Sequence, residues 1–209
     1  MKIIILAGGT AERLKPLTNN TPKPLLDVNG KPIINYIVEE VKKLDLNDIY
    51  ISTNEKFEND FNNWKQTNNI DAKIIIEEMP DGAKLGAIAG LSFLIEKEEI
   101  NEDCMIIAGD NLFGFDIKEF VEFYKNKNAS VIAAFKVDKD ANRFGIISLN
   151  DKNKITDFEE KPENPKSNLV ATACYILTKE AIGMIKKYLA EGNAKDSPGY
   201  FIEWLSKKI

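Results

Sequence analysis

The sequence predicts an α/β fold, in which a mainly parallel, Rossmann-like sheet is flanked by helices and carries a small antiparallel extension. Short apolar runs alternate with amphipathic stretches over the first two thirds of the chain, which is typical of βαβ units. Beyond about residue 140, strand-like pieces follow one another, which favours antiparallel pairing. At 209 residues the chain can bury a continuous core without disulfides or a structural metal. We therefore expect one domain spanning residues 1–209.

The predicted strands are the short apolar runs themselves. Five of them form the parallel part, and three form the extension. In chain order they span residues 2–7, 48–53, 72–77, 104–108 and 130–137, and then 145–149, 155–159 and 169–177.

The predicted helices have apolar residues three and four positions apart, so one face of each can pack on the sheet. The sequence shows no repeat, low-complexity tract or Pro/Gly-rich linker that would divide the chain. In chain order these helices span residues 32–44, 58–66, 85–96 and 117–125, followed in the extension by residues 179–188 and 200–207.

The composition excludes several classes of function. The net charge of −5 argues against nucleic acid or an anionic membrane surface as the main partner. The sequence contains no histidine, which excludes metal ligation by histidine and a Ser-His-Asp triad. Carboxylates, lysines, arginines and backbone amides remain as the candidate chemical groups.

The cysteines and the apolar runs indicate the compartment. Cys104 and Cys174 lie far apart in apolar runs, so we expect reduced core residues rather than a disulfide or a metal site. No apolar stretch approaches the ~18 residues of a membrane span, and the N-terminal run is too short for a signal peptide. We therefore expect a cytoplasmic protein.

The first chemical motif follows the first predicted strand. Residues 6–14 read L-A-G-G-T-A-E-R-L, in which Gly8 and Gly9 let the backbone turn sharply and bring N–H groups close to an anion. Lys23 follows in the run T-P-K-P-L-L, where the flanking prolines hold it in an extended segment. The P-loop and the dinucleotide fingerprint are both absent, and an ordinary βα turn is the alternative for the glycines alone. Arg13 and Lys23 together favour a triphosphate site.

This stretch resembles the opening pattern of the sugar-1-phosphate nucleotidylyltransferase family, L-A-G-G-x-G-T-R-L-x-P-L-T…P-K-P-L, which is found in glucose-1-phosphate thymidylyltransferases. The resemblance implies that the loop wraps the triphosphate of a nucleotide. It places Arg13 on the phosphates and Lys23 near the reacting α-phosphate. The other loop residues that it assigns to the nucleotide are Leu6, Ala7, Gly8, Gly9 and Thr10.

Two residues depart from the family pattern. Ala11 replaces its third glycine, and Glu12 replaces its threonine. A carboxylate beside a triphosphate is unfavourable unless it points away or pairs with a cation. We therefore expect Glu12 to face outward.

A second motif, C-M-I-I-A-G-D-N at residues 104–111, ends a predicted buried strand with an aspartate. Open α/β sheets bind ligands at the carboxyl ends of their strands. Asp110 offers the hard oxygen atoms that Mg²⁺ prefers, although Asp-Asn after a strand is also a common turn. The family resemblance implies that Asp110 binds Mg²⁺ and that Asn111 contacts the sugar.

Small residues open the third predicted helix, in the run D-G-A-K-L-G-A-I at residues 81–88. Glycine would let a planar base lie against the backbone, and it would equally allow close packing of the helix on the sheet. The run resembles the L-G-T-A-G-A stretch of the family, which implies base contact at Gly86, with Gly82 as a second candidate.

Three later motifs match the family in order: R-F-G at residues 143–145, E-K-P at 160–162 and S-N-L at 167–169. Without the resemblance, Glu160 and Lys161 would be interpreted as a solvated charge pair. The resemblance implies that Gly145, Glu160 and Lys161 hold the hydroxyls and phosphate of the sugar. It also implies that Ala171 and Thr172 line the sugar pocket. Residues 1–138 would then form the nucleotide-binding half, and residues 139–209 the sugar-binding extension.

The second metal carboxylate of the family belongs to a D-x-G-T motif, which this sequence lacks. Asp157 and Asp196 do not have the surroundings to replace it. Two expectations follow. Either one carboxylate and the phosphates hold the metal, or the chain has weak or no activity.

The predicted reaction transfers a nucleoside monophosphate from a nucleoside triphosphate to a sugar 1-phosphate, giving a nucleotide-sugar and pyrophosphate. The nucleophile is already an anion, so positioning and charge neutralisation suffice without a general base. The alternatives are a cytidylyltransferase acting on a non-sugar phosphate such as phosphocholine, and a non-catalytic protein that binds a nucleotide-sugar. An NAD-dependent dehydrogenase is disfavoured by the glycine spacing. The sequence leaves open the base, the sugar and whether the chain forms a homo-oligomer.

Overall fold

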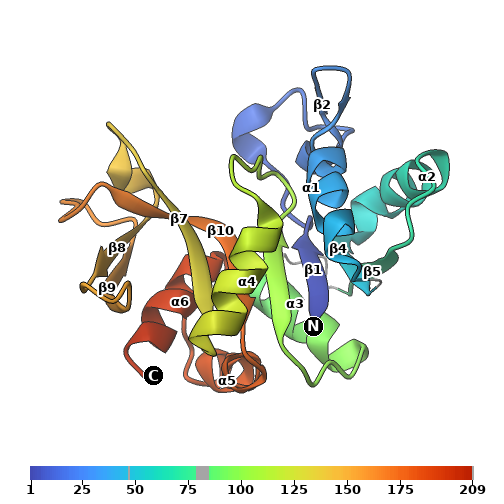
Figure 1. The fold of residues 1–209 in the computed structure, drawn as a ribbon. Coiled ribbons are helices and arrows are strands. Elements are labelled where there is room, and N and C mark those ends of the chain that lie inside the picture. The colour runs from blue at the N-terminus through green and yellow to red at the C-terminus, as the bar shows by residue number, and fades with distance from the viewer. Residues whose placement is uncertain (47, 79–84, 209) are drawn as a thin grey trace.

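The computed structural model describes residues 1–46, 48–78 and 85–208, and its centre is an eight-stranded mixed sheet (Figure 1). The strand order is β5-β4-β1-β6-β10-β8-β9, and β7 pairs with β10 away from this path. Helices cover both faces of the sheet, which confirms the predicted α/β class. None of the helices in the described part is both long and apolar enough to cross a membrane.

Four strands form the parallel part of the sheet. They are β1 (Lys2–Leu6), β4 (Ile49–Asn54), β5 (Lys73–Glu77) and β6 (Cys104–Ala108). β1 pairs in parallel with both β4 and β6, and β5 pairs in parallel with the outer side of β4. The carboxyl ends of all four strands therefore lie at one edge of the sheet, which is the upper edge in Figure 1.

The antiparallel part is organised around the nine-residue strand β10 (Leu169–Leu177). β10 pairs antiparallel with β6, with β7 (Val131–Lys136) and with β8 (Gly145–Leu149), and β8 pairs with β9 (Ile155–Glu160). The prediction that residues 130–137 belong to the parallel strands is wrong. In the structure, β7 bonds to β10 because the later strand lies between it and β6.

The two faces of the sheet have separate apolar cores. Alternate residues of β1 show why: Ile3 and Ile5 belong to one core, and Ile4 belongs to the other. The helices of the first core are α1 (Ile33–Val41), α2 (Glu58–Thr67) and α4 (Ile117–Lys127), and those of the second are α3 (Ala87–Lys97), α5 (Lys179–Ala190) and α6 (Pro198–Ser206).

Helix boundaries differ from prediction where local chemistry intervenes. The predicted helix 85–96 begins at Ala87 because Gly86 has a positive φ of 81° and cannot be helical. The predicted helix 32–44 ends at Val41 and continues as the 3₁₀ turn Lys42–Leu44. The hairpin of β2 (Asp27–Val28) and β3 (Lys31–Pro32) was not predicted.

Both cysteines are free and buried, as expected. Cys104 lies in β6 and Cys174 in β10, within different apolar cores. Burial raises the pKa of each thiol to about 12, so neither is a reactive thiolate at neutral pH.

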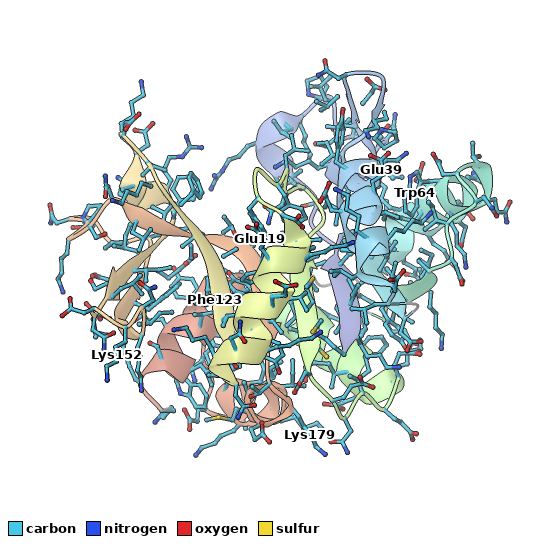
Figure 2. All side chains as sticks on the ribbon, viewed as in Figure 1. Glu39, Trp64, Glu119, Phe123, Lys152 and Lys179 are labelled. Atoms are coloured by element: carbon cyan, nitrogen blue, oxygen red, sulfur yellow. The ribbon has the colours of Figure 1, made fainter. Side chains whose placement is uncertain are left out.

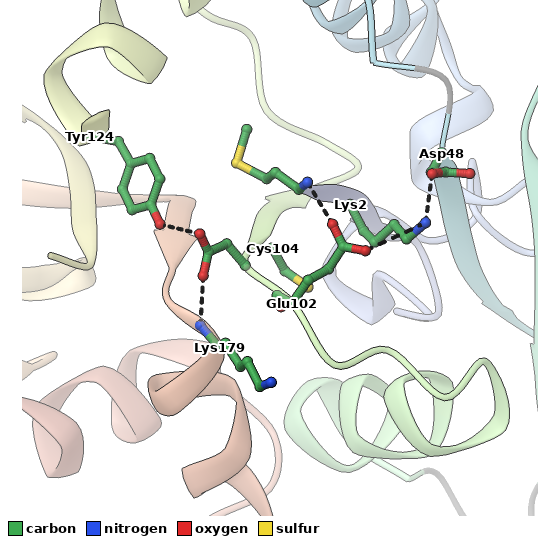
Figure 3. Close-up of polar contacts among 8 residues, drawn as sticks. Lys2, Asp48, Glu102, Cys104, Tyr124 and Lys179 are labelled. Carbon is green, nitrogen blue, oxygen red and sulfur yellow. Dashed lines mark hydrogen bonds and ion pairs between the residues drawn. The ribbon is translucent and has the colours of Figure 1, made fainter. Parts of the chain in front are cut away.

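Asp103 ties three elements together at the amino end of β6 (Figure 3). One carboxylate oxygen accepts the backbone amide of Lys179 at the start of α5, at 2.8 Å, and the other accepts the hydroxyl of Tyr124 from α4, at 2.5 Å. Burial and this hydrogen bond raise the pKa of Tyr124. Asp103 therefore anchors one helix on each face of the sheet.

We expect Asp103→Ala to lower the free energy of unfolding by about 2 kcal/mol, because the Lys179 amide and the Tyr124 hydroxyl lose their acceptor. Urea denaturation followed by circular dichroism measures the change. Asp138→Ala removes an exposed carboxylate from the loop after β7 and is the matched control, expected to shift stability by less than about 0.5 kcal/mol. Equal losses in the two variants would contradict the anchoring role of Asp103.

Candidate active site

The loop after β1 starts from a backbone held by the neighbouring strand. The amide of Ala7 donates to the carbonyl of Ser52 at 2.7 Å. The carbonyl of Gly8 accepts from Nδ2 of Asn54, at the end of β4, at 2.8 Å. The direction in which the loop leaves the sheet is therefore fixed before the predicted phosphate contacts begin.

The two glycines of the loop have different structural roles. A methyl group on Gly8 would lie 2.5 Å from Oε1 of Glu77, so the close approach of the loop to β5 requires glycine. Gly9 is exposed and has open space where a side chain would be. The left-handed residue of the turn is Ala11, with φ 45°, rather than either glycine. This conformation disfavours alanine, and it explains why a glycine suits that position in related loops.

The far side of the loop is closed by short-range contacts. The hydroxyl of the buried Thr18 donates to the carbonyl of Ala11 at 3.0 Å. Glu12 faces solvent, as predicted, and pairs with Lys15 at 2.5 Å. Thr10 also has a partner within the structure. Contacts within the chain thus hold the loop, and its one carboxylate is paired with Lys15.

Lys23 and Asp110, which are far apart in the sequence, form an ion pair at the carboxyl edge of the sheet. Nζ of Lys23 lies 2.5 Å from Oδ2 of Asp110, and both side chains are about one-third exposed. Pro22 and Pro24, on either side of the lysine, are both buried and hold its backbone in place. The structure therefore brings together the two residues predicted to bind the α-phosphate and the metal.

The backbone around Asp110 is attached to the strands on both sides. The amide of Gly109 donates to the carbonyl of Leu6 at 2.8 Å, which joins the ends of β1 and β6. Nδ2 of Asn111 donates to the carbonyl of Ala173 in β10, at 3.0 Å. This commits one N–H of the Asn111 amide to the sheet and leaves the second N–H and the carbonyl oxygen for its predicted contact with the sugar.

The chemistry of Asp110 suits Mg²⁺. That ion commonly takes one or two protein carboxylates and completes its shell with phosphate oxygens and water. Asp110 is a partly exposed carboxylate paired with Lys23, beside the loop after β1 that is predicted to bind a triphosphate (residues 6–14, called the triphosphate loop below). This matches such a site. Within the described residues, no group of three acidic or cysteine side chains is close enough to form a metal site without help from a ligand.

The predicted sugar residues Gly145, Glu160 and Lys161 lie together on paired strands. Gly145 is the register partner of Glu160 between β8 and β9. The Lys161 amide donates to the carbonyl of Phe144 at 3.0 Å, and its φ of 51° turns the chain away from the strand. The Lys161 ammonium lies 3.1 Å from Oε1 of Glu160. The motifs R-F-G and E-K-P therefore form one unit.

A pocket of about 290 Å³ joins this unit to the triphosphate loop. Its lining residues are Arg13 from the loop, Arg143 and Phe144 from the R-F-G motif, and Lys161 from the E-K-P motif. Three of the four are cations, so the pocket suits a phosphate group. Arg143 was not assigned a role from the sequence, although it stands in a motif that was identified there.

The predicted sugar-pocket residues Ala171 and Thr172 lie in β10, at an irregularity in its pairing with β7. Ala171 is buried and packs in the second apolar core. The Thr172 hydroxyl donates to the carbonyl of Ala133 at 3.0 Å. These contacts explain both residues structurally, and their contact with a sugar stays a prediction.

Gly86 has a structural reason to be glycine. A methyl group there would lie 2.6 Å from the carbonyl oxygen of Lys195, which also accepts the amide of Ile88 at 2.9 Å. This close packing is the alternative that the sequence left open, and it does not exclude contact with a base. Gly82, the second candidate, lies outside the described residues.

Glu77 is a buried carboxylate that the sequence analysis did not select. It is 7% exposed at the end of β5 and accepts the Ser52 hydroxyl at 2.8 Å. Its carboxylate fits between Gly8 and Gly90, since a methyl group on either glycine would come within 3 Å of it. Burial raises the pKa of Glu77 above 4.5, and the Ser52 hydrogen bond opposes this shift. The signal in the sequence was a charged residue at the end of an aliphatic run.

The sequence profile described as Nucleotidyl transferase matches residues 2–202 of the chain. A protein of Methanocaldococcus jannaschii named bifunctional protein GlmU is 35% identical over 90% of this chain and 42% of its own length. The UTP–glucose-1-phosphate uridylyltransferase AglF of Haloferax volcanii is 31% identical over 85% of this chain and 72% of its own length. The chain thus spans less than half of the first of these relatives.

The fold is also similar to solved structures. A Bacillus anthracis protein, provisionally described as a glucose-1-phosphate thymidylyltransferase and crystallised with a sucrose, aligns with a TM-score of 0.85. It is 30% identical and covers all of this chain, which in turn covers 83% of it. A UDP-glucose pyrophosphorylase complexed with UDP-glucose aligns with a TM-score of 0.81 at 22% identity, which supports the fold alone.

The raised pKa of Glu77 predicts a pH-dependent effect of Glu77→Gln. A carboxyl group whose pKa is higher in the folded state contributes stability below its unfolded pKa of about 4.5, and loses it as the pH rises through the folded pKa. Glutamine keeps an acceptor for Ser52 but cannot ionise. We expect Glu77→Gln to be more stable than the wild type at pH 8, with the difference shrinking towards pH 4. Thermal denaturation across this range measures it, and a difference independent of pH would contradict the argument.

Proposed function

The chain belongs to the nucleotidyl transferase family of sugar-1-phosphate enzymes, and we propose that it transfers a nucleoside monophosphate from a nucleoside triphosphate to a sugar 1-phosphate. The products are a nucleotide-sugar and pyrophosphate. The relatives named above support this class of reaction, and the residues below are the ones that would carry it in this chain.

One observation carries the proposal: Arg13 of the triphosphate loop and Lys161 of the E-K-P motif line the same pocket. A protein that only binds a nucleotide does not need a second cationic segment, from a distant part of the sequence, beside the phosphates. A transferase has that need, because its two anionic substrates must meet at the reacting phosphorus. The cations of the pocket would offset the repulsion between them.

In the proposed reaction, an oxygen of the sugar phosphate attacks the α-phosphorus of the triphosphate in line. The new oxygen–phosphorus bond forms as the bond from the α-phosphorus to the bridging oxygen breaks, and the electron pair leaves with pyrophosphate. No proton has to be removed from the nucleophile, so the absence of histidine from the sequence is no obstacle. Positioning and charge neutralisation are the tasks left to the protein.

The nucleotide would bind at the loop after β1. The backbone of residues 6–10 approaches the phosphates there, and the open space beside Gly9 lets a phosphate come close to the chain. Arg13 neutralises charge on the β- and γ-phosphates. Lys23 exchanges its ion pair with Asp110 for the α-phosphate, which becomes more negative as the reaction proceeds.

The metal-binding role falls to Asp110. A bound Mg²⁺ would supply further neutralisation of the phosphate charge, held by this carboxylate and by the phosphates themselves. The ion pair with Lys23 holds the carboxylate in place at the carboxyl edge of the sheet until the substrates arrive.

The sugar would bind on β8 and β9. Gly145 and Glu160 offer a backbone group and a carboxylate for hydroxyls, and Lys161 offers a cation for the phosphate. We extend the proposal to the division of labour along the chain: residues 1–138 bind the nucleotide, and residues 139–209 bind the sugar. We further propose that the reaction takes place in the cytoplasm, where the free thiols are stable.

A pyrophosphate-release assay with Mg²⁺ tests the proposed function directly. We expect release when one of UTP, dTTP, GTP, ATP or CTP is paired with glucose 1-phosphate, mannose 1-phosphate or another sugar 1-phosphate. Phosphocholine with CTP tests the cytidylyltransferase alternative. Nucleotide binding without release across the whole panel would favour a binding protein instead and overturn the proposed transferase.

Lys23→Ala and Asp110→Asn should each lower kcat in this assay by about 100-fold or more, because each removes charge that acts on the transferred phosphate. Circular dichroism should show an unchanged fold, since partly exposed ion pairs contribute only about 0–1 kcal/mol. Lys152→Ala is the control, at the β8–β9 turn far from α1 (Figure 2). Wild-type rates in either site variant would refute the assigned roles.

A further inference from the structure

Glu160 is almost completely buried, whereas Lys161, the next residue, is not. The Glu160 side chain is 6% exposed and the Lys161 side chain is 49% exposed. Oε1 of Glu160 already accepts two donors: the Ser197 hydroxyl at 2.8 Å and the Lys161 ammonium at 3.1 Å. The oxygen with capacity for a ligand hydroxyl is therefore Oε2.

Two glycines make the space in which Oε2 lies. A methyl group on Gly199 would lie 1.8 Å from Oε2, and one on Gly145 would lie 2.5 Å from the Phe158 ring and 3.0 Å from Oε2. Gly199 lies in the first turn of α6, where alanine would otherwise be favoured over glycine. Glycine at this position therefore serves the carboxylate of Glu160 rather than the helix.

Ser197 also departs from the usual role of its position. It is the N-cap residue of α6, where serine commonly accepts a backbone amide of the first turn, but its side chain makes no such bond. The equivalent residues Asp116 of α4 and Thr178 of α5 do accept one. The Ser197 hydroxyl donates to Glu160 instead.

The segment that carries Ser197 is anchored on both sides. Before it, the carbonyl of Lys195 accepts the amide of Ile88 at the start of α3, at 2.9 Å. After it, Oε2 of Glu203 in α6 accepts the backbone amide of Glu160 at 3.1 Å. The hydroxyl of Ser197 is thus aimed by backbone contacts, and it can hold the carboxylate in one rotamer.

We propose that Ser197 and Gly199 are positioning residues for sugar recognition, which fix the Glu160 carboxylate so that Oε2 accepts a hydroxyl of the sugar. This inference rests on the proposed function, which assigns the sugar to Glu160 and Lys161. It adds a device from α6 to the sugar site on β9. A carboxylate fixed in advance loses little conformational entropy on binding, and it accepts only a hydroxyl that reaches its one available oxygen.

The test compares two affinities that differ only by the sugar. Calorimetry on the full chain with Mg²⁺ measures the Kd of UDP-, dTDP- and ADP-glucose and of GDP-mannose, each beside its free nucleoside diphosphate. The Kd of the diphosphate divided by the Kd of the nucleotide-sugar isolates the contribution of the sugar. We expect Ser197→Ala and Gly199→Ala to reduce this ratio about tenfold while leaving the affinity for the diphosphate unchanged. Ser197→Thr keeps the hydroxyl and should retain the wild-type ratio.

Gly183→Ala is the matched control, because it makes the same substitution in helix α5 where the added methyl group meets open space. An unchanged ratio in both Ser197→Ala and Gly199→Ala, together with a reduced ratio in Glu160→Ala, would overturn the positioning role and leave the proposed function standing. Equal losses of diphosphate and sugar-nucleotide affinity would show a purely structural role and would also overturn it. A wild type that binds every nucleotide-sugar no better than its diphosphate would overturn both the inference and the proposed function.

Discussion

Strand β10 brings the two groups of candidate site residues together: those that follow β1 and β6, and those on β8 and β9. It runs antiparallel to β6, and its pairing with that strand covers Cys174 to Leu177. The earlier part of β10 therefore extends beyond the carboxyl end of β6, where it pairs with β8 through Val170 and Ile146. Because β6 ends just before Asp110, the strands that carry the proposed sugar-binding motifs extend outward from the same edge of the sheet as this proposed metal ligand. Every later feature of the site depends on this register.

Both buried carboxylates of the site are packed against pairs of glycines. Glu77 lies between Gly8 and Gly90, and Glu160 lies against Gly145 and Gly199. Each also accepts a serine hydroxyl, from Ser52 and Ser197 respectively. Burying a carboxylate costs free energy unless it is hydrogen-bonded, so these hydroxyls offset part of that cost.

The two carboxylates lie between different elements of the fold. Glu77 packs between Gly8 of the loop after β1 and Gly90 of α3. Glu160 of β9 packs against Gly199 in the first turn of α6 and accepts the hydroxyl of Ser197. Among the residues that the structure describes, Glu160 has a lysine within ion-pair distance, at 3.1 Å, and Glu77 has none. For Glu77, burial raises the pKa, so the fold disfavours the charged form of this carboxylate. Glu77 thus packs beside the loop proposed to bind the nucleotide, and Glu160 lies beside the strands proposed to bind the sugar.

The ion pair between Lys23 and Asp110 contributes to the site rather than to stability. Both side chains are about one-third exposed, so water screens their attraction. Their value lies in placing opposite charges at the point where phosphates and a cation are expected. Burial of the flanking prolines fixes the lysine, and the Gly109 amide on the Leu6 carbonyl fixes the aspartate.

The sequence by itself determined the strands and the helices and pointed to the candidate phosphate-binding residues, because these follow from local periodicity and from short motifs. The eight predicted strands and six predicted helices all appear, with boundaries shifted by a few residues. Lys23 could be selected because it stands between two prolines in a short motif, and Asp110 because it stands at the end of an apolar run. Their contact could not be derived, since it depends on β1 and β6 being neighbours.

Only the tertiary structure decided the strand order and the surroundings of the carboxylates. Nothing local in residues 169–177 indicates that this strand lies between β6 and β7, because pairing is a long-range property of the sheet. Ser197 and Gly199 stand just before the predicted helix 200–207 and were assigned no role from the sequence, because their contact with Glu160 joins segments that are distant in the sequence. The sequence therefore determined which chemical groups are present, and the packing of β10 and α6 decided which of them meet.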